Sequence, residues 1–523
     1  MSFLLPRLTV AATVVVAVAG CSLAPTYERP VAPIPANYPV QPLASKPDDK
    51  RDQAVVTVTT PGSAPTTAGA ASATVAAAAA TGALPASAAQ GQAASAADLG
   101  WSTVFTDPRL QALIRLALDN NRDLRVAVQR VQEAMAQYGI VDSDRYPTLG
   151  AGGNAQITRN PENLRGPNST DSITRYYQAG VGMTAFELDF FGRVKNLSEA
   201  AYQQFLATDQ ARRTVQINLV AQTAEAYFRL RTANELLRLT RSTLESREAT
   251  LRLVQSRYDV GIASALDLNQ ARSQVDSIRA DLAGLERAAA QAGNALQLIL
   301  GTPLPADLPE PGRFGKEQVI ATIPVGLPSE LLERRPDILG AENALKAANA
   351  NIGAARAAFF PNISITGLLG VASPQLSSLF SGGQGFWQFS PQIQVPLFSG
   401  AVAGGLELAE ARKNIAVAEY EKAIQLAFRE VADALAGEAT YGSQLDALRS
   451  LEASALETLR LAQLRYETGI DSFLQVQNAQ VDLYSTQRAF LQTGMDSLMN
   501  RVELYKALGG GWTEQSAQPA TAS

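Results

Sequence analysis

The chain contains a pair of long helical tracts that fold back on each other, and this pair occurs twice. The first tracts run from Gly192 to about Val260 and from Leu266 to Leu300, and the second from Gly400 to Tyr466 and from Phe473 to Leu508. The first tract contains no proline, and at 1.5 Å per residue it would reach roughly 100 Å. Globular helices average about three turns, so tracts of this length predict a coiled coil or a helical tube.

The two pairs are copies of one another. The stretch QSRYDVGIASALDLNQARS, which begins at Gln255, recurs later as QLRYETGIDSFLQVQNAQV. Glycines keep a fixed offset of 208 residues through both copies: Gly192 with Gly400, Gly261 with Gly469, and Gly301 with Gly509. Such a duplication makes each chain contribute two similar walls to a tube. The repeated stretch is then the turn at the far end of each hairpin, where Gly tolerates positive φ.

A shorter helical pattern precedes the first pair, between about residues 107 and 144. Its apolar residues, among them Leu110, Leu113 and Ile114, are spaced three or four apart. We expect Asp107 to cap this helix and Pro108 to occupy its first position.

Four short segments of a different kind interrupt the helical patterns, at about residues 147–158, 175–186, 362–372 and 386–397. In the last of them, FWQFSPQIQVPLF, apolar residues alternate with Gln and Ser. Period two with one apolar and one polar face is typical of a transmembrane barrel strand, and the lengths fit. The alternative is a pair of edge hairpins on a soluble globular domain.

Four strands are too few to close a barrel. An open edge in lipid leaves backbone groups without hydrogen-bond partners, so the chain would have to pool its strands with copies of itself. Two copies would give eight strands with a nearly filled interior, and three would give twelve strands with a pore. The polar face of Gln and Ser favours the water-filled trimer.

The N-terminus has the features of an export signal. Residues 1–20 combine Arg7, an apolar run and small residues ahead of Cys21, the only cysteine. A Cys after Val-Ala-Gly resembles a bacterial lipobox, which implies cleavage before Cys21 and attachment of diacylglycerol to its sulfur. By the same resemblance, Ser22 favours sorting to the outer membrane. The alternative is an ordinary signal peptide followed by an incidental Cys.

The segment after the signal changes in character along its length. We expect residues 21–42 to form a lipidated N-terminal segment. Residues 43–99 consist largely of Ala, Ser, Thr, Gly and Pro, with few large side chains. Because so little apolar surface is available to offset the entropy of ordering, we expect a flexible tether there.

The composition argues against catalysis, metal binding and nucleic-acid binding. The chain has no His and one Cys, which removes the commonest general base, most zinc sites and Cys-His nucleophiles. The net charge is −5, and Lys and Arg stand singly among acidic neighbours, so a basic nucleic-acid footprint is missing. We therefore expect no enzyme activity, no cofactor and no nucleic-acid partner.

Three long segments of the sequence carry a family resemblance. They are GWSTVFTDPRLQALIRLALDNNRDLRVAVQRVQEAMAQYGI, LLERRPDILGAENALKAANANIGAARAAFFPNISITG and VELYKALGGGW. They closely resemble the outer membrane factors of tripartite efflux pumps, the TolC, OprM and NodT-like lipoprotein group. This resemblance implies a mixed α and β membrane protein. It would be a homotrimeric duct with a twelve-stranded outer-membrane β-barrel, four strands per chain, continuous with a long periplasmic α-helical barrel.

The resemblance also implies a division of the chain. One repeat would occupy residues 100–304, an equatorial linker 305–328 and a second repeat 329–512. Residues 513–523 would form a disordered C-terminal tail.

The hairpin tips, at about residues 257–267 and 465–475, are where the family meets a periplasmic adaptor protein. The residues that match the family's motif are Val260, Gly261 and Ile262 in the first tip and Thr468, Gly469 and Ile470 in the second. The alternative is that the two glycines only permit the turns.

The family also closes its tip like an iris, through polar links between neighbouring hairpins. By this resemblance Asp267 would face Arg465 and Tyr466. The constriction itself would contain Leu474, Gln475 and Asn478, with Asp471 restoring some negative charge. The alternative is an ordinary solvated ion pair, which contributes little to closure.

Three functions are compatible with these features. The first is a passive export duct for small toxic compounds in the outer membrane, working with an adaptor and an inner-membrane transporter of the RND type. The second is the outer-membrane duct of a type I protein secretion system. The third is a periplasmic coiled-coil scaffold without a pore. The lipobox and the ALGGGW motif favour the first, and the apolar strand face argues against the third.

Overall fold

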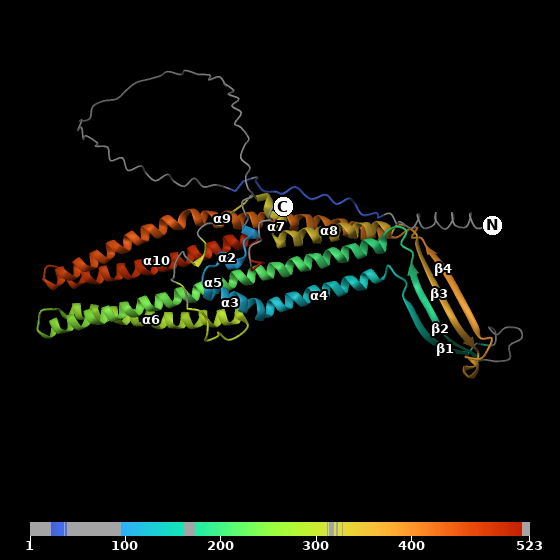
Figure 1. The fold of residues 1–523 in the computed structure, drawn as a ribbon, viewed down its shortest axis with the longest axis horizontal. Coiled ribbons are helices and arrows are strands. Elements are labelled where there is room, and N and C mark those ends of the chain that lie inside the picture. Colours follow the sequence, from blue (N-terminus) through green and yellow to red (C-terminus); the bar gives the residue numbers. More distant parts are fainter. Residues whose placement is uncertain are drawn as a thin grey trace, which may run out of the picture.

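The protein is elongated, with a four-stranded sheet at one end and two helical hairpins at the other (Figure 1). Helices from both halves of the sequence pack together between these ends. No helix in the described part of the chain is both long enough and apolar enough to cross a membrane. This computed structural model describes residues 22–35, 37–38, 96–159, 161, 173–310, 312, 318–320, 323–326 and 328–514.

Three predicted features fall wholly or mainly outside these ranges. They are the signal segment, the acylation site Cys21 and most of the tether at 43–99.

The first repeat opens with three helices: α2 (Trp101–Val104), α3 (Pro108–Asn120) and α4 (Arg122–Ser143). As predicted, Pro108 is the first residue of α3, and the Asp107 side chain caps the helix by accepting from the Arg109 N–H at 2.9 Å. The predicted helical pattern is divided at Asn121, which the sequence did not indicate. Its side-chain oxygen accepts from the Leu124 N–H at 2.9 Å, so it caps α4.

The four strands form a single antiparallel sheet in the order β1-β2-β3-β4, so the hairpins of the two repeats pair with each other. The strands are β1 (Leu149–Arg159), β2 (Ile173–Glu187), β3 (Asn362–Ser373) and β4 (Gly385–Gln394). The described residues supply no further strand beside β1 or β4, so both edges of the sheet are open.

The register aligns the apolar residues of all four strands. Ala151 pairs with Val181, Val181 with Leu369, and Leu369 with Trp387. The side chains of Val181, Leu369 and Trp387 are 54%, 69% and 76% exposed. The alternation in the sequence therefore produces one continuous apolar surface across the sheet, as the pattern of barrel strands predicted.

The long helices account for most of the length of the molecule. In the first repeat α5 and α6 form one hairpin, and in the second α9 and α10 form the other, while α8 packs against both α5 and α9. Their bounds are α5 (Arg193–Asp259), α6 (Ala265–Leu300), α8 (Pro336–Ala357), α9 (Gly400–Glu467) and α10 (Phe473–Ala507). The short α7 (Leu331–Arg334) leads into α8.

A large buried cluster, here called the equatorial core, joins the two repeats near the middle of the molecule. Its largest side chains come from α2, the segment after α2, α5, α9 and α10: Trp101, Phe105, Tyr227, Phe228, Tyr420 and Tyr505. The rings of Phe105 and Tyr505 meet edge to face at 6.0 Å. Because the first and last helices of the chain meet here, the core fixes the two hairpins at their base.

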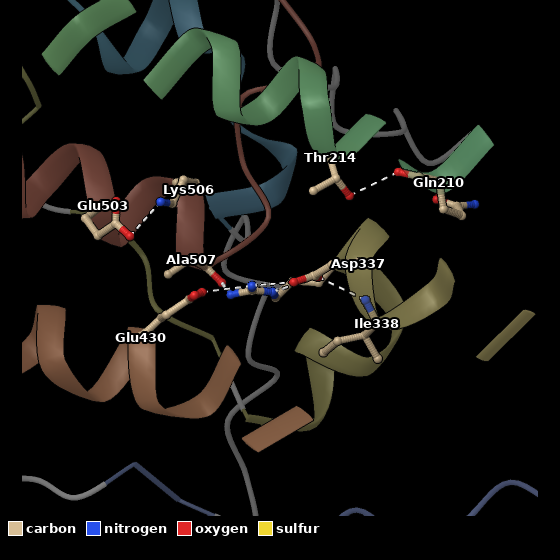
Figure 2. A network of polar contacts seen from close by, with 9 residues as sticks. Gln210, Thr214, Asp337, Ile338, Glu430, Glu503, Lys506 and Ala507 are labelled. Carbon is tan, nitrogen blue, oxygen red and sulfur yellow. Dashed lines mark hydrogen bonds and ion pairs between the residues drawn. The ribbon is translucent and has the colours of Figure 1, made fainter. Parts of the chain in front are cut away.

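A buried guanidinium ties three helices together beside this core. Arg335 donates to both carboxylate oxygens of Asp337, to Glu430 at 2.9 Å and to the carbonyl of Ala507 at 2.8 Å. Figure 2 shows Asp337, Glu430 and Ala507 converging on it from α8, α9 and α10. The contact with Ala507 also satisfies a carbonyl in the last turn of α10, which has no partner within its own helix.

The C-terminal boundary differs from the sequence prediction, which began a disordered tail at residue 513. The N–H groups of Trp101 and Ser102, at the start of α2, donate to the carbonyls of Thr513 and Glu514 at 3.1 and 3.2 Å. The Glu514 carboxylate also pairs with Arg115 at 2.8 Å. The first two residues of the predicted tail therefore belong to the folded body, because they satisfy the free N–H groups of a helix start.

Candidate functional site at the hairpin tips

The first hairpin reverses through a tight turn after α5. The Arg257 carbonyl accepts from the N–H groups of Ile262 and Ala263 at 2.8 and 3.1 Å. Within the turn closed by these hydrogen bonds, Gly261 has a φ of 78°. Side-chain-bearing residues rarely adopt this conformation, so the turn requires glycine here.

The second hairpin makes the same turn 208 residues later. The Arg465 carbonyl accepts from Ile470 and Asp471 at 2.9 and 3.3 Å, and Gly469 has φ 77°. The repeated glycine is thus explained by backbone geometry alone. A further role for it in binding a partner stays a prediction.

The six predicted adaptor-contact residues lie at these turns, and all six are exposed. They include three apolar side chains that are each more than half exposed: Val260, Ile262 and Ile470. Apolar side chains at the outermost point of a helical hairpin do not contribute to its packing, so they form a surface available to another molecule.

Asp267 is held by the backbone of its own hairpin. Its Oδ2 accepts from the N–H and hydroxyl of Ser264 at 3.0 and 2.9 Å, and its N–H donates to the Ser264 hydroxyl at 3.1 Å. This reciprocal arrangement is a capping box that begins α6. Within one chain, therefore, the residue predicted to serve the gate is an N-terminal helix cap.

Within the chain, Arg465 pairs with Asp471 of its own turn through both carboxylate oxygens. A contact between Arg465 and Asp267 of a neighbouring hairpin stays a prediction. The hydrogen bonds from Arg465 hold the pKa of Asp471 below its ordinary value. A lowered pKa keeps the Asp471 carboxylate ionised, and its contribution to the charge of a constriction stays a prediction. Asp471 lies six residues after Arg465, whereas Asp267 lies on the other hairpin.

Tyr466 lies buried between the two hairpins, 7% exposed. Its ring packs edge-on against Phe473 at 5.4 Å, and the Arg257 guanidinium stacks 4.8 Å from its centre. Burial raises the pKa of Tyr466, Arg257 lowers it, and the carboxylate of Asp267 raises it. Asp267 and Tyr466 are thus close enough to interact electrostatically, although no hydrogen bond joins them in the described structure.

The three predicted constriction residues, Leu474, Gln475 and Asn478, lie on the exposed side of α10. Leu474 is 45% exposed. A single chain cannot form a constriction from one helix face, so their role as a ring depends on assembly.

Sequence reasoning overlooked Arg257. The signal was present, because Arg257 and Tyr258 are the first copy of the Arg-Tyr pair that recurs as Arg465 and Tyr466. Besides stacking on Tyr466, Arg257 donates to the Glu467 carbonyl at 3.3 Å, so it joins the first hairpin to the second.

Only a small apolar cluster holds the two tips together. This tip cluster consists of Val254, Leu268, Ala271, Ala462, Tyr466, Phe473, Val476 and Ala479. It draws residues from all four long hairpin helices, but five of its eight members are the small residues Ala or Val.

A polar zone separates the tip cluster from the equatorial core. The hydroxyls of Thr240 and Tyr484 lie 2.9 Å apart, and Gln480 donates to the Thr250 hydroxyl at 3.2 Å. Arg247, 3% exposed, donates to the Gln274 side chain. Each of these contacts can be exchanged for water at modest cost, so the zone binds the hairpins less firmly than apolar packing does.

Known proteins share this architecture along most of the chain. The model of the outer membrane efflux protein family matches residues 113–302 and 327–510. The chain belongs to that family. It is 43% identical over 500 residues to the probable efflux pump outer membrane protein TtgC of Pseudomonas putida, covering 95% of this chain and 94% of the relative. It is 41% identical over 496 residues to outer membrane protein OprJ of Pseudomonas aeruginosa, covering 95% and 94%.

Solved structures extend this result to the fold of the efflux protein. The open state of the Neisseria gonorrhoeae MtrE outer membrane channel matches with a TM-score of 0.78 and 34% identity, covering 95% of this chain and 100% of that one. A membrane protein from Pseudomonas aeruginosa matches with a TM-score of 0.79 and 39% identity, covering 94% and 100%. The protein is an outer membrane efflux channel component with the mixed α and β architecture of TolC-like channels.

Proposed function

We propose that three copies of this efflux protein form a passive, gated duct for small toxic compounds. The duct would cross the outer membrane as a twelve-stranded barrel and continue through the periplasm as a tube of helical hairpins. An adaptor would join it to an inner-membrane transporter of the RND type. The chain itself would carry no catalytic step, because a duct transmits what its pump selects.

The observation that carries this proposal is the open sheet with one apolar face. The row Ala151, Val181, Leu369 and Trp387 spans all four strands and is suited to lipid. In lipid the unpaired edges of β1 and β4 would each cost hydrogen bonds, and pairing with copies of the chain removes that cost. Twelve strands leave a lumen wide enough for small solutes.

The described N-terminal residues, 22–35 and 37–38, support anchoring through an acylated Cys21. The Ser22 hydroxyl donates to Asn196 at 2.7 Å, in the first turn of α5 beside the sheet. The Asn349 side chain of α8 donates to the Pro25 carbonyl at 2.6 Å. A lipid on the preceding residue would therefore enter the membrane at the level where the strands begin. Cys21→Ala should abolish palmitate labelling and leave assembly intact, and persistent labelling would contradict the anchor.

The substrate class rests on the chemistry that the relatives' names record. Three relatives of this chain from Pseudomonas putida are named as toluene, solvent and antibiotic efflux pump outer membrane proteins, and they are 41–43% identical to it. By this likeness the cargo of the present duct would be small and largely apolar, rather than a polypeptide.

The test is planar-bilayer conductance of the purified full-length protein, with its mass in detergent measured on the same sample. We expect a trimer with a small conductance that rises when the tip is loosened by Tyr466→Ala. The exposed Tyr146→Ala variant, far from the tip, is the matched control and should conduct like the parent. A well-folded oligomer that never conducts would overturn the proposal.

A further inference from the structure

The repeat places an arginine and a tyrosine at the tip of each hairpin. One arginine and one tyrosine stack on each other inside the chain, and the other two are exposed. Inside the chain, Arg257 of the first hairpin stacks on Tyr466 of the second. By the 208-residue repeat, Arg465 is the counterpart of Arg257, and Tyr258 is the counterpart of Tyr466. Tyr258 is 40% exposed and the Arg465 side chain is 52% exposed.

The two unused halves lie on different hairpins. In the first hairpin Arg257 makes the contact inside the chain and Tyr258 does not. In the second hairpin Tyr466 makes it and Arg465 does not. Arg257 extends from the first hairpin toward the second. Because the hairpins are copies, the same geometry would extend Arg465 from the second hairpin toward the next hairpin of a ring, on the side away from the first. A surface with complementary halves on opposite flanks joins chains head to tail, and such an interface closes into a ring when the rotation between chains divides a full turn, as in the proposed trimer.

We propose that Arg465 stacks on Tyr258 of the partner subunit, so that the contact inside each chain is repeated between neighbouring chains. The inference rests on the proposed three-chain duct, and it adds the residues that join the chains at the tip. The occupant of this surface is a second copy of the chain, because the first repeat already supplies the matching half.

The two versions of the contact differ at one position of the turn. Arg257 has Ala263 there, whereas Arg465 has Asp471, which binds it through both carboxylate oxygens. Among the described residues, no acid of the first turn pairs with Arg257, and Asp259 accepts from the Gln255 side chain instead. Arg465 instead exchanges between Asp471 and the partner's Tyr258. This exchange of partners would let the tips of neighbouring chains separate.

Cross-linking distinguishes contacts between chains from contacts within one. The paired variant Arg465→Cys with Tyr258→Cys is made in full-length protein carrying Cys21→Ser, so that no other thiol is present. Treated with a short bismaleimide, it should give covalent dimers and trimers on denaturing gels. The matched control, Arg257→Cys with Tyr466→Cys, should give only monomers with an internal cross-link.

The outcomes separate this inference from the proposed duct. If the protein has the mass of a trimer but the first pair gives no product between chains, the inference is wrong and the duct stands. If the protein is monomeric in detergent at every concentration tested, both are wrong. Products between chains from the control pair as well would also overturn the inference, because the two contacts would then not be distinct.

Conductance tests the competition by Asp471. Asp471→Ala gives the second turn the residue of the first, so Arg465 is released to the neighbouring chain and residual conductance should fall. Arg465→Ala should raise conductance, and the double variant should behave like Arg465→Ala, since Asp471 acts only through the arginine. Asp446→Ala is the control, because it removes the exposed carboxylate that pairs with Arg449 elsewhere on α9. A rise in conductance with Asp471→Ala would contradict the competition.

Discussion

The equatorial core and the tip cluster hold the same two hairpins, but they do so by very different means. At the equator the first and last helices of the chain meet around large buried rings such as Trp101, Phe228 and Tyr505. At the tip eight buried residues hold the hairpins together, and most of them are small. Between the two, hydroxyl and amide groups join the hairpins through the contacts of Thr240 with Tyr484 and of Gln480 with Thr250.

This difference indicates how one molecule can be rigid and still open. Burying apolar area contributes about 25 cal/mol per Å², so the equator contributes far more stability than the tip. A structure opens first where few apolar contacts would be lost. The equator therefore fixes the fold and the distance between the hairpins at their base, and the tip is the part whose packing can be broken without unfolding the chain.

The largest expected effect tests the equatorial side of the comparison. Arg335→Ala leaves Asp337 and Glu430 without the guanidinium that pairs with both of them (Figure 2). Removing one partner of a buried ion pair costs about 3–5 kcal/mol, so we expect a large fall in the Tm of the whole protein. Circular dichroism during heating measures it, with the exposed Arg449→Ala as control. An unchanged Tm would show that the equator does not limit global stability.

The tip should respond differently to the loss of a comparable side chain. Phe473 is 1% exposed, and Phe→Ala in a core costs about 3–5 kcal/mol. Because the tip can separate locally, we expect a smaller fall in Tm than for Arg335→Ala, together with faster hydrogen exchange in residues near 254 and 466. The exposed neighbour Leu474→Ala is the control. Exchange that accelerates equally at the equator would remove the distinction between the two regions.

The outer side of the equatorial core supplies a pH-dependent contribution. Glu342, 4% exposed, accepts from Tyr27 at 3.1 Å and pairs with Arg29 and with Lys346. Burial raises its pKa, but the hydrogen bonds from Arg29 and Lys346 outweigh this and hold the pKa below the ordinary 4.5. A lowered pKa means that this stabilisation is fully present above pH 4.5 and is lost as pH falls through the pKa of the folded state.

Glu342→Gln should therefore cost about 1.5–3 kcal/mol at pH 7 and progressively less in acid. Protease sensitivity of the N-terminal segment and Tm, both measured from pH 7 to pH 3, check this. The exposed Glu457→Gln is the matched control. A difference between Glu342→Gln and the parent that does not shrink below pH 4.5 would contradict the assignment of the carboxylate as the ionised partner.

The smallest effect is expected on the surface of the tip half. Glu457 and Arg460 pair at 2.7 Å one turn apart on α9, and both side chains are more than half exposed. Solvent screens such pairs, so Glu457→Ala should leave both Tm and conductance within experimental error of the parent. A measurable change would mean that this face is covered by another molecule in the assembly.

Much of the architecture could be predicted because it depends on local rules. The proline-free tracts predicted long helices, and the structure places them at Arg193–Asp259 and Gly400–Glu467. The turns at Gly261 and Gly469 need positive φ, which only glycine adopts readily. The alternation around Trp387 predicted the apolar face of the sheet. Each of these features is set by neighbours within a few positions along the chain.

The partners of individual polar groups depended on tertiary structure. Asn121 ends one helix and begins the next because its side chain accepts from the Leu124 N–H. Thr513 belongs to the folded body because its carbonyl accepts from the Trp101 N–H at the start of α2. Arg257 stacks on Tyr466 of the other hairpin, and only the packing of the two tips brings these side chains together. By itself the sequence determined the lengths, turns and faces of the elements, because backbone and periodicity constraints are local. The tertiary structure decided which charged groups meet, because Coulomb and hydrogen-bond energies depend on distances of a few ångströms that packing alone sets.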